Sequence, residues 1–143
     1  MPIRSAEAVW NGDLMEGDGR MSFGSGAFEG PYSFESRMEE GPGTNPEELI
    51  GAAHAGCFSM QLSGVLSAAG HPPTSIRTGA RVAFNKADGG WAITGVELST
   101  EGEVPGIDEA AFAEHANTAK EICPVSGALA GVEITLSASL AGG

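Results

Sequence analysis

Basic residues are scarce in this sequence. Seven lysines and arginines stand against 19 aspartates and glutamates, and the formal net charge is −12 at pH 7. A charge of this size repels nucleic-acid backbones and anionic lipid surfaces. The composition therefore predicts no nucleic-acid partner and no membrane partner. With so few cations available, a buried arginine becomes a candidate for a specific role.

Long apolar runs and targeting signals are also missing. No apolar run approaches the roughly 20 residues that a membrane span requires. Residues 1–10 contain no apolar segment of the kind that forms the centre of a secretory signal peptide. A cytoplasmic location is the expectation that follows.

Cysteine is limited to Cys57 and Cys123, and neither belongs to a Cys-x-x-Cys motif. The two cysteines and three histidines lack the spacing of the usual zinc sites, so no metal and no cofactor are predicted. Structural disulfides are rare in a reducing cytoplasm. The two cysteines are therefore either unrelated core thiols or a reversible redox couple.

Periodicity and turn signals predict a single α+β domain over residues 1–143. The expected element order is β-β-β-α-β-β-α-β. The predicted strands cover residues 3–10, 21–23, 32–38, 75–85, 91–100 and 132–140, and the predicted helices cover 46–69 and 108–122. A hairpin turn is expected at residues 88–90.

The first predicted helix has unusually clear boundaries. Asn45 can cap it, Pro46 suits its first position, and Glu48 would complete a capping box. Gly70 would end it. After Glu48 the helix carries no charge except on His54, which predicts burial on most sides. Because so small a chain cannot surround this helix, we expect a partner subunit to cover part of it.

Cys57 lies in the middle of this helix, where the field of a helix N-terminus does not reach. Burial alone would raise the pKa of this thiol. A reactive Cys57 therefore needs a cation from another segment, and Arg37, at the end of the third predicted strand, is the most natural source.

An arginine that enters a buried site needs a carboxylate beside it. Glu47 could be that carboxylate, or it could simply be a favourable charge at the start of the helix. About 15 Å of helix rise separates Glu47 from Cys57. Either an arginine bridges the two, or Glu47 serves the Cys57 of a partner chain.

Two further residues have alternative interpretations. His54 lies one turn before Cys57 and could act as a base or could be a core histidine bonded to a backbone carbonyl. Cys123 could be a buried thiol at a helix end, or a resolving thiol placed where local opening costs little.

Two motifs resemble those of the OsmC/Ohr family of hydroperoxide reductases. Residues 44–59, Thr-Asn-Pro-Glu-Glu-Leu-Ile-Gly-Ala-Ala-His-Ala-Gly-Cys-Phe-Ser, are similar to its first cysteine motif, and residues 123–126, Cys-Pro-Val-Ser, to its second. Residues 73–76, 104–108 and 132–136 are similar to the OsmC branch, so the resemblance extends over nearly the whole chain.

This resemblance implies an OsmC-like fold in an intertwined homodimer, with central long helices packed against two mixed sheets. It implies a thiol-dependent peroxidase that reduces organic hydroperoxides to alcohols in defence against oxidative or osmotic stress. Cys57 would pass through a sulfenic acid and then form a disulfide with Cys123. The implied reductant is a dithiol, and the family suggests one that bears a lipoyl group.

The resemblance also implies an arginine and a glutamate beside the first cysteine, in an active site at the subunit interface. The glutamate falls on Glu47 and, in the OsmC branch, the arginine on Arg37. The Ohr branch places its arginine in an early glycine-rich turn, which keeps Arg20 as the alternative. His54 and Phe58 are assigned to the substrate pocket. Two rival functions remain open: a non-enzymatic dimer that binds a small acyl ligand, and a redox-sensing dimer.

Overall fold

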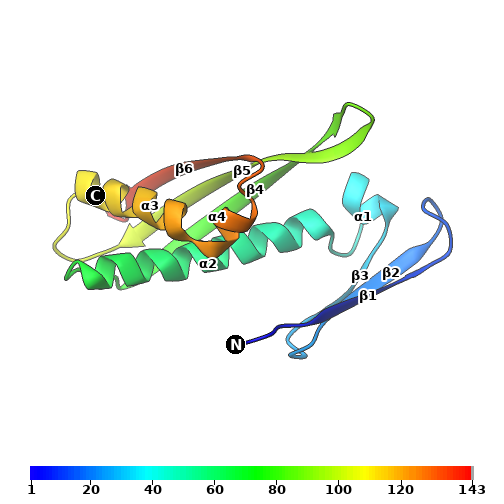
Figure 1. The fold of residues 1–143 in the computed structure, drawn as a ribbon, viewed down its shortest axis with the longest axis horizontal. Coiled ribbons are helices and arrows are strands. Elements are labelled where there is room, and N and C mark those ends of the chain that lie inside the picture. Colours follow the sequence, from blue (N-terminus) through cyan, green and yellow to red (C-terminus); the bar gives the residue numbers. More distant parts are fainter. Residues whose placement is uncertain (143) are drawn as a thin grey trace. The chain divides into compact units, whose positions relative to one another are not determined.

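The computed structural model describes residues 1–142. The chain forms two compact units, Met1–Leu49 and Ile50–Gly143. The first unit contains an antiparallel sheet with the strand order β1-β2-β3, formed by β1 (Ala6–Asn11), β2 (Asp18–Phe23) and β3 (Glu29–Tyr32) (Figure 1). Gly19 on β2 is required by packing, because a Cβ there would lie 2.5 Å from the Tyr32 ring.

The prediction of a strand over residues 32–38 is wrong. β3 ends at Tyr32, and the short helix α1 (Phe34–Met38) follows it. Ser33 caps α1: its side chain accepts from the Ser36 N–H at 3.1 Å, and the Ser36 hydroxyl accepts from the Ser33 N–H at 2.9 Å. This reciprocal serine pair favours a helical turn. Arg37 consequently lies in the last turn of a helix and not at the end of a strand.

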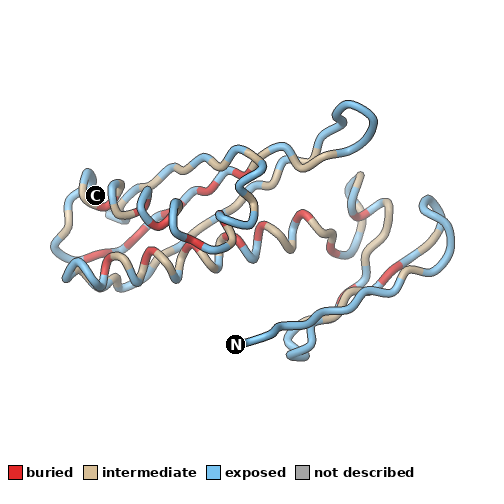
Figure 2. Tube along the Cα trace, in the orientation of Figure 1, coloured by how far each residue is buried: buried red, intermediate tan, exposed pale blue. Residues whose placement is uncertain are grey.

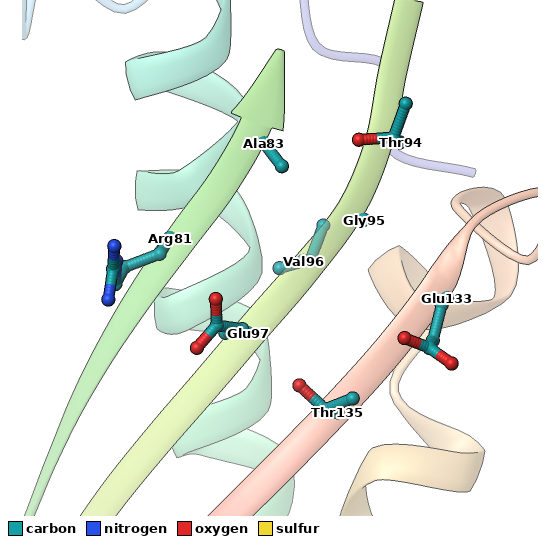
Figure 3. A pocket seen from close by; sticks show the side chains of 8 residues that line it. All are labelled: Arg81, Ala83, Thr94, Gly95, Val96, Glu97, Glu133 and Thr135. Carbon is teal, nitrogen blue, oxygen red and sulfur yellow. The ribbon is translucent and has the colours of Figure 1, made fainter. Parts of the chain in front are cut away.

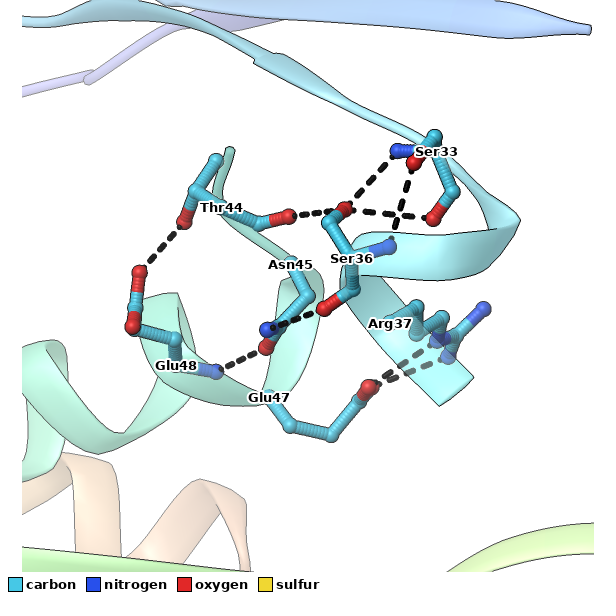
Figure 4. Close-up of polar contacts among 7 residues, drawn as sticks. All are labelled: Ser33, Ser36, Arg37, Thr44, Asn45, Glu47 and Glu48. Carbon is cyan, nitrogen blue, oxygen red and sulfur yellow. Dashed lines mark hydrogen bonds and ion pairs between the residues drawn. The ribbon is translucent and has the colours of Figure 1, made fainter. Parts of the chain in front are cut away.

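The long helix α2 (Pro46–Ala68) agrees with its prediction to within one residue. Asn45 is its cap, since the Asn45 side chain accepts from the Glu48 N–H at 2.8 Å. The expected capping box does not form, because the Glu48 carboxylate accepts from the Thr44 hydroxyl at 2.8 Å instead (Figure 4). After α2 the chain reverses at Gly70, which adopts a φ of +88°.

The second unit is built on a mixed sheet. β4 (Ser75–Ala87) and β5 (Gly90–Glu103) form the predicted antiparallel hairpin, and β6 (Glu133–Leu140) runs parallel to β5. The helices α3 (Glu109–Ile122) and α4 (Pro124–Ala128) connect β5 to β6, and α2 and α3 cover one face of the sheet (Figure 1). Asp108 caps α3, as predicted, by accepting from the Ala111 N–H at 2.8 Å.

Side chains of α2, α3 and the sheet share one hydrophobic core. Its fully buried members include Phe58, Leu62 and Leu66 from α2, Leu98 from β5 and Phe112 from α3. The α+β class is confirmed. Helices α1 and α4 extend the expected element order, and within residues 1–142 only the second sheet contains a parallel pair.

The opposite side of α2 is uncovered in the single chain. Ala53, Gly56, Met60 and Gly64 are exposed, and Figure 2 shows buried and exposed positions alternating along this helix. A side chain added at Gly56 or Gly64 would meet no atom within 4 Å. The expectation that no apolar run approaches the length of a membrane span is wrong for α2, which by length and composition alone could cross a membrane, a property that it shares with the core helices of soluble proteins.

Candidate active site

The two cysteines meet although 66 positions separate them. Cys57 lies on α2 and Cys123 directly precedes α4, and the two sulfur atoms lie within hydrogen-bond distance, 3.1 Å apart. Both are free thiols; Cys57 is partly exposed, whereas Cys123 is 1% exposed. This arrangement places a buried thiol directly behind a thiol that solvent can reach. It favours a redox couple over two unrelated core thiols.

The two thiols influence each other's protonation. Burial raises the pKa of Cys57, the hydrogen bond with Cys123 raises it further, and a backbone hydrogen bond from Val125 acts in the opposite direction. Burial also acts to raise the pKa of Cys123, but hydrogen bonds from Cys57, Ser126 and Val125 outweigh it and lower that pKa. Within residues 50–142 no basic side chain supports a Cys57 thiolate.

His54 is completely buried one turn before Cys57. Its Nε2 lies 2.8 Å from the Ser126 Oγ, and within residues 1–142 its Nδ1 has no hydrogen-bond partner. Desolvation by burial lowers the pKa of His54, so the imidazole is neutral near pH 7. The predicted bond to a backbone carbonyl is therefore wrong, and a serine hydroxyl takes the place of that carbonyl.

Arg37 and Glu47 form the ion pair that the sequence suggested. The Arg37 Nε donates to one Glu47 oxygen and an Arg37 terminal nitrogen donates to the other, each at 2.9 Å (Figure 4). The hydrogen bond with Glu47 raises the pKa of Arg37, which keeps the guanidinium charged. Glu47 is buried, with 7% of its surface exposed. Of the two interpretations of Glu47, the carboxylate that holds an arginine has direct support.

Hydrogen bonds between α1 and the start of α2 determine where this pair forms. The Ser36 hydroxyl donates to the Thr44 carbonyl at 2.7 Å, and the Asn45 side-chain amide donates to the Ser36 carbonyl at 3.1 Å. Because these bonds hold the two helix ends together, Arg37 and Glu47 can meet through the Nε and one terminal nitrogen of the guanidinium. Local sequence patterns did not predict this arrangement, because they did not predict α1.

Arg20 is placed differently. It pairs with Glu29 across the β2–β3 ladder at 2.9 Å, and 57% of its side chain and 63% of that of Glu29 are exposed. An exposed pair of this kind contributes little energy and leaves the cation in water. This environment favours Arg37 over Arg20 as the arginine of an active site.

An apolar cavity of about 240 Å³ lies beside Arg37 in the first unit. Among residues 1–142, Arg37 is the only charged residue that lines it, and the rest of its wall comes from Trp10, Leu14, Tyr32, Ser33, Phe34 and Met38. Sequence reasoning missed this cavity, because residues from β1, the following turn, β3 and α1 form it jointly. The one sequence feature that indicated a cavity is the group of large side chains on either side of the glycine-rich residues 17–30, namely Trp10, Leu14, Tyr32 and Phe34.

The two side chains assigned to a substrate pocket, His54 and Phe58, are fully buried in the single chain. Phe58 belongs to the hydrophobic core with Leu62 and Leu98. Their contact with a substrate remains a prediction. Within the described residues, no group of three or more histidines, cysteines or carboxylates could hold a metal ion.

A further hollow, of about 220 Å³, lies on the β4–β5–β6 sheet (Figure 3). Arg81 and Glu97 are directly opposed across the β4–β5 ladder, and Thr135 is opposite Glu97 on β6. Acidic, basic and hydroxyl side chains thus mix on a solvated face, and no thiol lines the hollow. It offers none of the groups that redox chemistry requires.

The chain is similar to known proteins over almost its full length. Residues 39–137 match the family model of the OsmC-like protein. The chain is 50% identical over 138 residues to the peroxiredoxin OsmC of Escherichia coli (strain K12), covering 96% of each chain. It is 33% identical over 99 residues to an organic hydroperoxide resistance protein of Xanthomonas axonopodis pv. citri, covering 68% of each.

The fold has close structural counterparts. The crystal structure of the organic hydroperoxide resistance protein OhrB of Bacillus subtilis superposes with a TM-score of 0.75 at 27% identity, over 94% of this chain and 97% of that one. An organic hydroperoxide resistance protein OsmC from Legionella pneumophila gives a TM-score of 0.73 at 22% identity.

Proposed function

The chain belongs to the OsmC-like protein family, and we propose that it is a cysteine-based peroxidase that reduces organic hydroperoxides to alcohols, with the whole chain as one OsmC-like domain. The observation that carries this proposal is the pair of free thiols 3.1 Å apart, one partly exposed and one buried. The relatives named for organic hydroperoxide resistance support the substrate class, and the proposed role is defence against oxidative or osmotic stress.

The reaction begins at Cys57, because it is the more accessible of the two sulfurs. Its thiolate attacks the distal peroxide oxygen, so that an S–O bond forms, the O–O bond breaks, and the alcohol leaves after taking up a proton. Cys123 then attacks the Cys57 sulfenic acid, forms the disulfide and releases water. An external dithiol, for which we propose a lipoyl group, reduces the disulfide by thiol exchange. A reducing compartment such as the cytoplasm suits this cycle.

Arg37 supplies the cation in this proposal. Burial alone disfavours the Cys57 thiolate, and the guanidinium would stabilise it and orient the peroxide. The bidentate contact with Glu47 holds Arg37 in one orientation. The apolar cavity beside Arg37 suits the organic part of the substrate, and we propose that His54 and Phe58 line the pocket near the sulfur.

A homodimer is part of the same proposal, because the exposed side of α2 consists of small and apolar residues. Burial of this side against a second copy removes apolar surface from water without enclosing a charge. Arg37 and Glu47 could then serve the Cys57 of either subunit.

We expect the protein to sediment as a dimer at micromolar concentration, with an unfolding midpoint that rises with protein concentration. Gly64→Leu should shift the equilibrium towards monomers, because the new side chain meets nothing within its own chain and must enter the interface. Sedimentation velocity of both proteins checks this. A monomeric parent protein would contradict the dimer and any exchange of residues between subunits.

The direct test of function is steady-state consumption of cumene hydroperoxide with dihydrolipoamide as the electron donor. A peroxidase turns over many equivalents and shows a transient Cys57–Cys123 disulfide. A redox sensor would form the disulfide without sustained turnover, and a ligand-binding protein would do neither. The absence of turnover with any dithiol would contradict the proposal.

Replacement of Arg37 by methionine should slow peroxide reduction about tenfold or more near pH 7. Loss of a close cation raises the pKa of a poorly solvated thiol by roughly one to three units, and each unit removes about nine tenths of the thiolate. Part of the lost rate should return as the pH is raised through the new pKa. Initial rates between pH 6 and pH 9 measure this.

Arg20→Met is the matched control for this variant, since it makes the same change at an exposed pair and should alter the rate little. Arg37→Lys should recover only part of the rate, because an ammonium group cannot engage both Glu47 oxygens and a peroxide in one plane. A severe loss in Arg20→Met with a nearly normal Arg37→Met would transfer the role to Arg20.

A further inference from the structure

The spacing of the two thiols suits more than the formation of a disulfide. The Cys57 and Cys123 sulfurs lie 3.1 Å apart, and both residues are free cysteines. A disulfide bond is about 2.05 Å long, so the sulfurs of the reduced pair stand farther apart than those of a disulfide. Two thiols at this separation can instead hold a single atom that bonds to both sulfurs.

The distance between the sulfurs indicates the bond angle at such an atom. Bonds of about 2.3 Å, the length of zinc–sulfur bonds, place two sulfurs about 3.8 Å apart at the tetrahedral angle and about 3.3 Å apart at a right angle. The observed distance of 3.1 Å is much closer to the second value. Trivalent arsenic, which has three bonds and a lone pair, forms bonds to sulfur of similar length at angles near a right angle. The spacing therefore favours trivalent arsenic over a tetrahedral metal ion.

The number of ligands points to the same atom. Across the described residues 1–142, no group of three or more histidines, cysteines and carboxylates is arranged to hold a metal ion. Zinc sites in proteins use three or four such ligands. An arsenic atom that already carries one carbon substituent needs only two sulfurs to complete its three bonds. Two thiols without a third donor therefore suit a monosubstituted arsenic(III) compound better than zinc, and better than inorganic arsenite, which has three bonds to give to thiols.

The exposure of the two cysteines determines the order in which the bonds form. Cys57 is partly exposed, whereas Cys123 is 1% exposed. An arsenic compound that arrives from solvent therefore meets Cys57 first. The second bond then forms within one molecule, because the Cys123 sulfur already lies 3.1 Å from that of Cys57. An intramolecular second contact of this kind raises the overall affinity by about a hundredfold to ten-thousandfold.

We propose that Cys57 and Cys123 form a chelating site for arsenic(III) compounds that carry one carbon substituent. With phenylarsine oxide, each sulfur forms one bond to arsenic, the bonds between arsenic and oxygen break, and the oxygen leaves as water with the two thiol protons. Arsenic stays trivalent and neither sulfur is oxidised, so the reaction needs no oxidant and no reductant. The binding is independent of the peroxidase function proposed above, whereas the loss of peroxide reduction that it causes rests on that function.

Thiol counting on the reduced full chain tests the site without any peroxide. One equivalent of phenylarsine oxide per chain should protect both thiols from a chromogenic thiol reagent, and intact-mass spectrometry should show one phenylarsenic group per chain. Excess 2,3-dimercaptopropanol should release this group and restore both thiols, whereas mercaptoethanol at the same thiol concentration should not. Two phenylarsenic groups per chain, or release by the monothiol, would overturn the inference.

Cys123→Ser keeps the exposed thiol and removes the second bond. Its affinity for phenylarsine oxide should fall about a hundredfold or more, and mercaptoethanol should then release the arsenic compound. Ser59→Ala is the matched control, since it removes a hydroxyl of the same helix, bonded to Thr78 at 2.7 Å, and should bind as tightly as the parent. Equal affinity in the parent and in Cys123→Ser would overturn the inference. Release from the parent protein by the dithiol alone requires no variant, so it decides the question if Cys123→Ser does not fold.

Zn²⁺ is the probe for a tetrahedral metal site on the same thiols. At equal concentration it should protect the thiols much less than phenylarsine oxide, because two sulfurs at 3.1 Å are too few and too close together for it. Stronger protection by Zn²⁺ than by phenylarsine oxide would overturn the inference.

A single addition of cumene hydroperoxide, without any dithiol, tests the consequence for the reaction. Protein loaded with one equivalent of phenylarsine oxide should consume no peroxide, because both sulfurs are bonded to arsenic. Treatment with 2,3-dimercaptopropanol, followed by gel filtration, should restore the reaction. Consumption by the loaded protein at the rate of the unloaded protein would overturn the inference. If the unloaded protein consumes no peroxide either, the peroxidase function fails, and the thiol count alone then decides whether the arsenic site exists.

Discussion

Cys57→Ser is expected to lower peroxide reduction by about a thousandfold or more. A serine hydroxyl is not ionised near neutral pH and is a weak nucleophile towards peroxide oxygen, so the S–O bond that begins the cycle has no counterpart. Cys123 cannot replace it, because that thiol is 1% exposed and lies behind Cys57. Loss of cumene hydroperoxide over time, with dihydrolipoamide in excess, measures the effect.

The pH profile of the parent protein gives the same experiment a second readout. Burial raises the pKa of Cys57, so in the absence of a cation little thiolate exists at pH 7 and the rate should increase as the pH is raised. A cation from Arg37 would move this rise to lower pH. If the Cys57→Ser variant keeps the parent rate, Cys57 is not the attacking thiol. The unfolding midpoint of the variant checks that the variant is folded.

Local sequence signals correctly predicted those helices and strands whose ends depend on a single interaction between neighbouring residues. Asn45 and Pro46 begin α2, Gly70 ends it, and Asp108 begins α3, because each satisfies a helix-end requirement that neighbouring residues alone decide. The β4–β5 hairpin was predictable for the same reason, since Asp88-Gly89-Gly90 makes a tight turn between two alternating runs.

The incorrect secondary-structure prediction falls on a short segment whose sequence suits either a strand or a helix. Residues 32–38 contain a pattern that suits a strand or a helical turn, and the reciprocal Ser33–Ser36 bonds decide for the turn. The side-chain partners were harder still. The contact of Cys57 with Cys123 and that of His54 with Ser126 join α2 to α4 across 66 and 72 positions. Only tertiary packing brings these residues together, so the spacing of residues in the sequence does not predict their contacts.

Arg37 shows how an incorrect local prediction can still identify the correct partner. The prediction placed this residue in a strand, whereas it lies on α1, yet charge had named Glu47 as one possible partner and the family resemblance selected that pairing. With few cations in the chain, a carboxylate buried at the start of α2 has few available partners. The scarcity of basic residues was therefore more informative than the periodicity of the segment.

Cys123→Ser should abolish sustained turnover while leaving a single reaction intact. Cys57 is unchanged, so the variant should still consume about one equivalent of peroxide and form the sulfenic acid. Without a second thiol 3.1 Å away, the sulfenic acid cannot become a disulfide. Excess peroxide should then oxidise it to the sulfinic acid, which thiols do not reduce.

Mass spectrometry of the oxidised variant and titration of consumed peroxide measure these two results together. The buried position of Cys123 makes serine a suitable replacement, since the change in size is small. Dimedone should label Cys57 in the variant and much less in the parent protein, in which the disulfide forms first. Repeated turnover at the parent rate would exclude Cys123 as the resolving thiol, because the dithiol would then reduce the Cys57 sulfenic acid directly.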